Sequence, residues 1–327
     1  MSSLSVLTPV YNHARYLEAM VEAILTQSRL PDEFLLVDDA SSDGTWPLIE
    51  ALRQRYPLIQ GSRNPTNRGV LANATSLLSQ TRSDYLYSAS SDDLVLPGFF
   101  EQAMSLLEAH PYAPLCCGQA VWWDEETEEQ YVGGLQMPQH NTYLSPEECL
   151  VYARRGCLDL AGHASLFRTD ALLKIGGYRE KLRWHCDWLA LYELAFRHGI
   201  CWVAQPLAVM RTHASSYSGT GTRQKAQHDE SLVALIDYLL LPSSRPVREA
   251  FAQSGLLALL GYPMARHLLT DPRRWRLLSG RYLGFLLEPL LRTFKMGRGI
   301  VRTLREGGAP RTAPSAFDLS RMRPKKK

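Results

Sequence analysis

The sequence contains no uninterrupted apolar run of the roughly 18 to 20 residues that a membrane-spanning helix needs. Its first residues, MSSLSVLTPVYN, also lack the charged segment and the long apolar run of a secretory leader. We therefore expect a cytoplasmic protein in which no segment crosses a membrane.

Cysteine is scarce and unpatterned, because the six cysteines show neither C-x-x-C spacing nor a paired framework. A structural zinc site or a disulfide scaffold is therefore not expected. We expect reduced thiols, as in a cytosolic protein. The cysteines are Cys116, Cys117, Cys149, Cys157, Cys186 and Cys201.

Two phosphate-binding patterns are also absent. No G-x-G-x-x-G follows the first predicted strand, which disfavours a dinucleotide-binding dehydrogenase. The segment LTPVYNHARYL lacks the glycine-rich, basic loop that sugar nucleotidyltransferases usually carry. These two classes of parallel-sheet enzyme are therefore disfavoured.

Charge is divided unevenly along the chain of 327 residues, whose formal net charge is +3. Residues 271–327 contain 15 Lys and Arg against 4 Asp and Glu, a net charge of +11, which leaves −8 for residues 1–270. Residues 273–308 interleave these cations with Leu, Phe, Trp and Ile, a pattern typical of binding to an anionic membrane surface.

The alternative for this basic segment is a set of helices that pack on the rest of the chain and expose their arginines to solvent. Pro289 would break or kink any long helix through it. Nucleic acid is not an expected partner, because no nucleic-acid-binding motif accompanies the charge.

Strands and helices alternate over the first 110 residues. Strands are predicted within residues 4–10, 31–39, 58–70 and 83–93, and helices at 16–27, 47–56, 71–79 and 97–110. This alternation predicts an α/β fold with a mostly parallel sheet flanked by helices. Further along, we expect a hairpin with an acidic turn at 116–134, a strand and a helix within 165–180, a helix at 184–198 and a pair of strands at 200–213.

Two pairs of acids follow predicted strands, Asp38–Asp39 in FLLVDD and Asp92–Asp93 in SASSDD. Because ligands of such sheets bind beyond the carboxyl ends of the strands, we expect both pairs to border one crevice. Mg²⁺ and Mn²⁺ prefer carboxylate oxygen and are often held by one or two carboxylates together with substrate phosphates. The pairs therefore indicate a metal-bridged diphosphate, whereas either pair alone could equally be a turn or a helix N-cap.

Five segments together resemble the family 2 glycosyltransferases, which have a GT-A fold. They are SVLTPVYNHARYLEAMVEAILTQS, FLLVDDASSDGT, NRGVLANATSLLSQTRSDYLYSASSDDLVLPG, GHASLFRTDALLKIGGYRE and HCDWLALYELAFRHG, in this order. The resemblance covers roughly residues 3–217, and the ordered set is far more specific than any one segment.

The resemblance implies an inverting transfer of a sugar from a UDP- or dTDP-sugar to an acceptor hydroxyl, with Mg²⁺ or Mn²⁺ as cofactor. The acceptor would be a saccharide or a lipid-linked molecule in surface polysaccharide or glycolipid synthesis. The protein would then lie at the inner face of the cell membrane. The alternative is a non-catalytic nucleotide-sugar-binding protein or a membrane-associated scaffold.

The resemblance also implies roles for individual residues. The nucleotide-binding residues would be Thr8, Pro9, Tyr11, Asp39, Asn67, Arg68 and Asp92. The metal ligands would be Asp93 and His213, and the general base would be Asp187. A single base suffices for direct displacement, because it takes the acceptor proton as the hydroxyl attacks the anomeric carbon.

Three further residues are candidates for contacts with the acceptor or the donor phosphates: His163, Trp184 and His185. Core packing for Trp184, a structural role for His163 and a helix cap for Asp187 are the alternatives. Two positions depart from the family pattern, because Ser90 and Cys186 stand where many members have further acids.

We expect three regions. Residues 1–221 form the GT-A domain, residues 222–308 a helical, basic and amphipathic extension, and residues 309–327 a basic, disordered tail.

Overall fold

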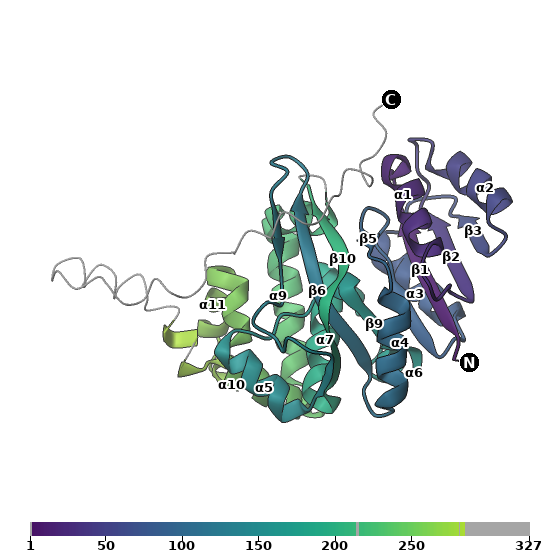
Figure 1. Cartoon of the computed structure of the whole chain (residues 1–327). Coiled ribbons are helices and arrows are strands. Elements are labelled where there is room, and N and C mark those ends of the chain that lie inside the picture. The colour runs from purple at the N-terminus through teal and green to yellow at the C-terminus, as the bar shows by residue number, and fades with distance from the viewer. Residues whose placement is uncertain (1, 214–215, 281, 285–327) are drawn as a thin grey trace.

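The computed structural model describes residues 2–213, 216–280 and 282–284, which form a mixed sheet with helices packed against it (Figure 1). The strands follow the order β3-β2-β1-β4-β9-β6-β10-β5, with β7 beside β6 and β8 beside β10. They are β1 (Leu4–Val10), β2 (Glu33–Asp38), β3 (Ile59–Arg63), β4 (Tyr85–Ser88), β5 (Leu94–Val95), β6 (Leu115–Asp124), β7 (Gln130–Val132), β8 (Thr142–Leu144), β9 (Ser165–Arg168) and β10 (Ile200–Thr212).

The described helices are α1 (Ala14–Leu25), α2 (Thr45–Arg55), α3 (Val70–Gln80), α4 (Phe99–Ala109), α5 (Pro146–Arg155), α6 (Thr169–Lys174), α7 (Cys186–His198), α8 (Tyr217–Arg223), α9 (Lys225–Leu240), α10 (Arg245–Ser254) and α11 (Gly261–Leu269). The 3-10 turns are η1 (Gly162–Ala164), η2 (Glu180–His185), η3 (Pro242–Ser244), η4 (Leu256–Leu260) and η5 (Pro272–Leu277).

The first half of the sheet is parallel, as the alternation of strands and helices predicts. β1 pairs in parallel with β2 and β4, so that Val10 lies beside Asp38 and Leu7 beside Ser88. The segments that follow β2 and β4 therefore leave the sheet at the same edge. In the second half, β9 runs antiparallel to β4 and β6, while β10 runs parallel to β6. The predicted α/β, mostly parallel sheet flanked by helices is confirmed.

Alternation along the strands divides the apolar side chains between two cores, one on each face of the sheet. Val6 and Leu36 belong to the core beneath α1, α2 and α4, whereas Leu7 and Leu35 belong to the core shared with α3, α7 and α9. All four side chains are at most 6% exposed. Burying one such side chain stabilises the fold by about 1.5–3 kcal/mol, so a slip of one residue in register would be costly.

Three predicted elements differ from the structure. The strand pair predicted at 200–213 is the single strand β10, whose register against β6 shifts on either side of Pro206, a residue without an N–H to donate. The helix predicted from residue 184 begins at Cys186, because Arg183 has φ 50° and interrupts the preceding turn. The strand predicted over 83–93 is shorter, because β4 ends at Ser88 and residues 89–93 connect it to β5.

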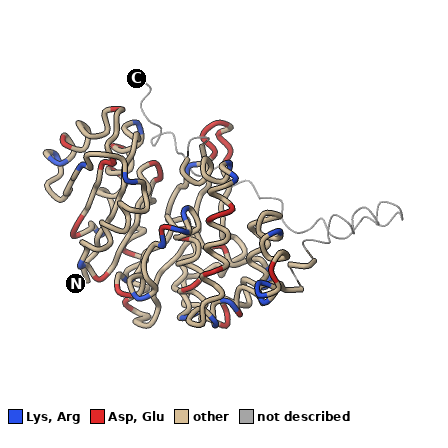
Figure 2. The backbone as a smooth tube through the Cα atoms, turned by 180° about the vertical axis from the view of Figure 1, so that it is seen from behind, with Lys and Arg blue, Asp and Glu red and all other residues tan. Residues whose placement is uncertain are grey.

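After β10 the described chain is helical, as predicted, and its helices pack on α7. Leu235 of α9 and Phe251 of α10 share a core with Leu189 of α7. Figure 2 shows Asp and Glu at the tip of the β6–β7 hairpin, while Lys and Arg recur on the helices after β10. Among the described residues, no helix has the length and apolar character needed to cross a membrane. Most of the predicted membrane-binding segment, with Pro289 and the tail 309–327, lies outside the described residues.

We call the helices that follow β10, from α8 to α11, the helical layer. A buried carboxylate joins this layer to α7. Glu193 is 1% exposed and accepts hydrogen bonds from the Tyr238 hydroxyl of α9 at 2.6 and 2.7 Å. It also lies 3.0 Å from Nε of Arg197 and 3.7 Å from Nη1 of Arg179. A carboxylate is stable in the interior only when it is paired, so Glu193 fixes α7 relative to α9.

We expect Glu193→Ala to lower the free energy of unfolding by about 3 kcal/mol, because two partly buried arginines and a tyrosine hydroxyl lose their partner. Urea unfolding followed by circular dichroism measures the change. The matched control, Glu249→Ala, removes a carboxylate from an exposed pair with Arg245 and should leave the curve almost unchanged. Equal midpoints for the two variants would contradict the role assigned to Glu193.

Candidate functional site

The Asp39 carboxylate organises the loop that follows β3. It accepts hydrogen bonds from the backbone N–H groups of Arg68 and Gly69 and from Nδ2 of Asn64, each 2.8 Å long. Burial alone would raise the pKa of Asp39, but hydrogen bonds led by that of Arg68 outweigh it and lower this pKa. Asp39 is therefore ionised at neutral pH and holds residues 64–69 against the carboxyl edge of the sheet.

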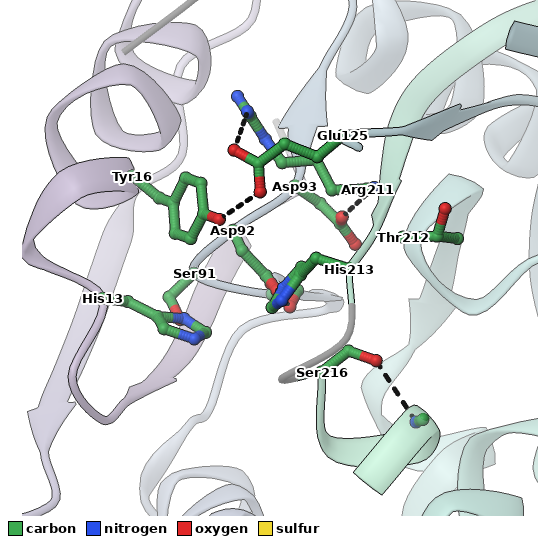
Figure 3. A network of polar contacts seen from close by, with 12 residues as sticks. His13, Tyr16, Ser91, Asp92, Asp93, Glu125, Arg211, Thr212, His213 and Ser216 are labelled. Atoms are coloured by element: carbon green, nitrogen blue, oxygen red, sulfur yellow. Dashed lines mark hydrogen bonds and ion pairs between the residues drawn. The ribbon is translucent and has the colours of Figure 1, made fainter. Parts of the chain in front are cut away.

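The second acidic pair lies on the turn between β4 and β5. Figure 3 shows Asp92 and Asp93 between His13 and Tyr16 on one side and the end of β10 on the other. They are 8% and 5% exposed. Asp92 lies 2.9 Å, Oδ2 to Nε2, from His213, and its other oxygen accepts the Ser90 hydroxyl.

Asp93 is held from two other segments of the chain. Its Oδ1 accepts the backbone N–H of Arg211 at 2.7 Å, and its Oδ2 is hydrogen-bonded to Nδ1 of His163. Each acid of the pair therefore has an imidazole partner that is distant in sequence. The structure brings together four predicted site residues here: Asp92, Asp93, His163 and His213.

Burial and pairing compete at these groups. Burial would raise the pKa of Asp92, but the His213 hydrogen bond and the charge of His13 hold it well below its usual range. The same hydrogen bond raises the pKa of His213. Burial raises the pKa of Asp93, although His163 opposes this. Burial would lower the pKa of His163, but Asp93 and then Asp187 raise it to about 9. His163 is therefore a cation at neutral pH.

A buried arginine and an acid from the hairpin complete this side of the site. The Arg211 side chain is 1% exposed, and its guanidinium carbon lies 5.0 Å from the ring centre of Tyr16 and 4.7 Å from that of Trp123. The Tyr16 hydroxyl donates to Glu125 at 2.6 Å. No sequence pattern predicts a role for these residues, because their contacts join positions between 88 and 195 residues apart.

Asp187 lies in the first turn of α7. Its Oδ1 accepts the backbone N–H of Trp188 at 2.7 Å, and its Oδ2 faces Gly162, where an added Cβ would lie 2.6 Å away. Burial raises the pKa of Asp187, although the charge of His163 opposes this. A partly buried carboxylate with a raised pKa is suited to accept a proton from a hydroxyl.

Trp184 is partly buried and His185 is buried. Trp184 stacks on His228 with ring centres 6.0 Å apart and planes at 15°, and a Cβ added at Gly221 would lie 2.1 Å from its ring. His185 is 8% exposed, and burial lowers its pKa to about 4, so this imidazole is neutral at pH 7. Both side chains pack where α7 meets the helical layer.

The residues expected on the nucleobase side lie along the same sheet edge as Asp39 but differ in exposure. Thr8 is fully buried within β1, Pro9 is half-buried, and Tyr11 is 48% exposed just beyond that strand. Asn67 and Arg68 are exposed, and the Asn67 side chain accepts the N–H of Gly69 at 3.1 Å. Tyr11, Asn67 and Arg68 are thus accessible to a ligand, whereas Thr8 faces the core.

Within the described part of the chain, no three His, Cys, Asp or Glu side chains form a group that could hold a metal ion. Asp92 and Asp93 nevertheless offer carboxylate oxygens, each of which keeps a lone pair beyond its present hydrogen bond. This set fits Mg²⁺ or Mn²⁺, which commonly takes one or two carboxylates and completes its shell with phosphate and water.

Residues 5–176 match the family model described as glycosyl transferase family 2. The putative glycosyltransferase EpsE of Bacillus subtilis is 35% identical over 108 residues, which are 33% of this chain and 39% of EpsE. The abequosyltransferase RfbV of Salmonella typhimurium is 31% identical over 117 residues, 35% of each protein. The aligned segments thus cover about two fifths or less of these relatives.

Two solved structures resemble the whole described fold. Residues 1–349 of S. aureus TarS in complex with UDP give a TM-score of 0.61 at 14% identity, covering 93% of this chain and 95% of that one. The mannosyltransferase PcManGT from Pyrobaculum calidifontis, in complex with GDP-Man and Mn²⁺, gives 0.52 at 18% identity, covering 89% and 88%. At such identities the likeness shows the fold, which is of the GT-A type.

We expect Asp39→Asn to lower the free energy of unfolding by about 2 kcal/mol at pH 7, because an amide NH₂ would face an N–H donor. A lowered carboxyl pKa stabilises the folded state above the unfolded value of about 4, and this contribution is lost as the pH falls through the folded pKa. The difference from the unmodified protein should therefore shrink below about pH 4. Urea unfolding at several pH values measures it.

The matched control for this comparison is Asp170→Asn, which alters an exposed carboxylate that pairs with Lys174. A difference between Asp39→Asn and the unmodified protein that stayed constant down to pH 3 would contradict the account of Asp39.

Proposed function

This chain belongs to glycosyl transferase family 2, and we propose that it catalyses an inverting transfer of a sugar from a nucleotide diphosphosugar to an acceptor hydroxyl. One observation carries the proposal. His163 is bonded to Asp93 on one side, and the charge of Asp187 acts on it from another. A carboxylate pair suited to a diphosphate and a carboxylate suited to deprotonation thus flank one imidazole.

On the donor side, the nucleotide would lie along the carboxyl edge of the sheet. The exposed ring of Tyr11 and the loop of Asn67 and Arg68 would border the base, near Asp39, and Asp92 would contact the ribose. TarS has been solved with UDP and with UDP-GlcNAc, which supports a UDP-sugar as donor. A dTDP-sugar is the other donor that we propose.

We propose Asp93 and His213 as the residues that hold Mg²⁺ or Mn²⁺, with Asp92 beside them. The Mn²⁺ in the PcManGT complex supports the use of a divalent ion. When bound, the ion would neutralise charge that develops on the leaving nucleoside diphosphate. The buried Arg211 adds positive charge to the same side of the site.

On the acceptor side, Asp187 would remove the proton of the attacking hydroxyl. Its carboxylate is already oriented by the Trp188 N–H, so little reorganisation is needed when the acceptor arrives. The reaction joins the acceptor oxygen to the anomeric carbon and breaks the bond from that carbon to the diphosphate. The proton passes to Asp187.

The acceptor that we propose is a saccharide or a lipid-linked molecule of surface polysaccharide or glycolipid synthesis, reached at the inner face of the cell membrane. The helical layer supports this location by exposing apolar side chains near its cations. Leu259, Tyr262 and Trp275 are 71%, 57% and 54% exposed, and Trp275 is flanked by Arg274 and Arg276.

Calorimetric titration with UDP and with dTDP, each with Mn²⁺ and with EDTA, tests the donor side. We expect Mn²⁺-dependent binding that Asp93→Ala weakens at least about tenfold and that Asp187→Asn leaves unchanged. Release of nucleoside diphosphate from a panel of UDP- and dTDP-sugars tests turnover, which Asp187→Asn should lower by about 10²–10⁴.

The outcomes separate the alternatives. Full turnover in both Asp93→Ala and Asp187→Asn would contradict the proposal. Nucleotide binding without turnover of any donor would favour a non-catalytic nucleotide-sugar-binding protein. Absence of binding would favour a scaffold.

A further inference from the structure

Two consecutive residues of the η1 turn, Gly162 and His163, contact Asp187 and Asp93. His163 is hydrogen-bonded through Nδ1 to Oδ2 of Asp93. The residue before it, Gly162, faces Oδ2 of Asp187. Asp93 and Asp187 are 94 positions apart in sequence, so this turn is a short structural connection between them.

The turn is fixed to the sheet by its backbone. The carbonyl of His163 accepts the hydroxyl of Tyr87, a β4 residue that is 1% exposed, at 3.0 Å. The carbonyl of Ala161 accepts the Ser165 hydroxyl at 2.6 Å and the N–H of Ala164 at 3.1 Å. Because these bonds tie η1 to β4 and β9, the turn has little freedom to move relative to the strands beside it.

Glycine at position 162 provides space for a carboxylate. An added Cβ would lie 2.6 Å from Oδ2 of Asp187, closer than such atoms approach in proteins. The φ of Gly162 lies outside the left-handed region, so the backbone conformation alone does not require glycine there. Since the turn is anchored, a methyl group would displace the Asp187 side chain and strain its bond to the Trp188 N–H.

The imidazole at position 163 orients the other acid. Asp93 has one oxygen on the Arg211 N–H and the other on His163. Loss of the imidazole would leave this buried carboxylate with the Arg211 N–H as its one donor among the described residues, and the carboxylate could then rotate about its side-chain bonds. Its position relative to a bound diphosphate would then be less defined.

We infer that η1 is a spacer that sets Asp187 relative to Asp93, with His163 and Gly162 as positioning residues for the two acids. The inference rests on the proposed function, because it takes Asp93 as the donor-side acid and Asp187 as the base. It gives His163 a role other than direct contact with acceptor or phosphate. It also predicts different effects for substitutions at the two positions. Changes at residue 163 should weaken donor binding, whereas changes at residue 162 should lower turnover.

The test compares His163→Ala, His163→Asn and Gly162→Ala in the full chain. The Asn amide nitrogen can occupy a position near that of Nδ1 and donate to Asp93. The measurements are the Kd for UDP with Mn²⁺, and kcat and KM for a nucleotide sugar that the unmodified protein turns over. Matched controls are His140→Ala at an exposed histidine and Gly280→Ala at a glycine with no atom near the added Cβ.

We expect His163→Ala to weaken UDP binding about tenfold and His163→Asn to restore most of it. Gly162→Ala should change the UDP Kd by less than about twofold and lower kcat about a hundredfold, the order expected for a reacting group displaced by about 1 Å. Both controls should match the unmodified protein.

Three results would overturn the spacer while leaving the proposed function intact. These are equal loss of binding and turnover in Gly162→Ala, full activity in Gly162→Ala, and no recovery in His163→Asn. Should Gly162→Ala fail to fold by circular dichroism, the pair of His163 variants decides. An unmodified protein that binds neither UDP nor dTDP, and releases neither of them from any donor, contradicts the proposed function, and the spacer with it.

Discussion

Two adjacent carboxylates buried in the turn between β4 and β5 are the constraint on which the site depends. Asp92 and Asp93 repel each other and lose hydration, which disfavours the ionised form of both. His213, 2.9 Å from Asp92, and His163, bonded to Asp93, oppose this effect. Arg211 adds a backbone donor to Asp93. The buried acidic pair is stable and oriented because two imidazoles and a backbone N–H, all from distant segments, are hydrogen-bonded to it.

The order of the strands in the sheet brings these partners to the acidic pair. His163 lies just before β9, and His213 follows β10. Both can reach the β4–β5 turn because β9 lies beside β4 and β10 beside β5. The antiparallel insertion of β9 into an otherwise parallel region is therefore what brings the η1 turn, and with it Asp187, to the acidic pair. Glu193 lies further along α7, the helix that carries Asp187. Its contacts with Tyr238 and Arg197 fix α7 to the helices that follow β10.

The sequence predicted the local elements well and the long-range contacts poorly. The strands and helices of the first 110 residues followed from periodicity, and the two acidic pairs from their place at strand ends. The three hydrogen bonds that Asp39 accepts from the loop after β3 were not predicted, since turn residues reveal nothing about their hydrogen-bond partners. Nor was the bond between His163 and Asp93, because pairing across 70 residues depends on strand order. Two strands were predicted where the structure has the single strand β10. Pro206 would end a strand in many sequences, but here it only shifts the register of β10 against β6.

If a single base, Asp187, acts opposite a donor held at Asp92 and Asp93, the acceptor displaces the diphosphate directly. The anomeric configuration of the purified product, determined by NMR beside that of the donor, tests it. We expect inversion, with an α-linked donor giving a β-linked product. Retention of configuration would require a second displacement and would contradict it.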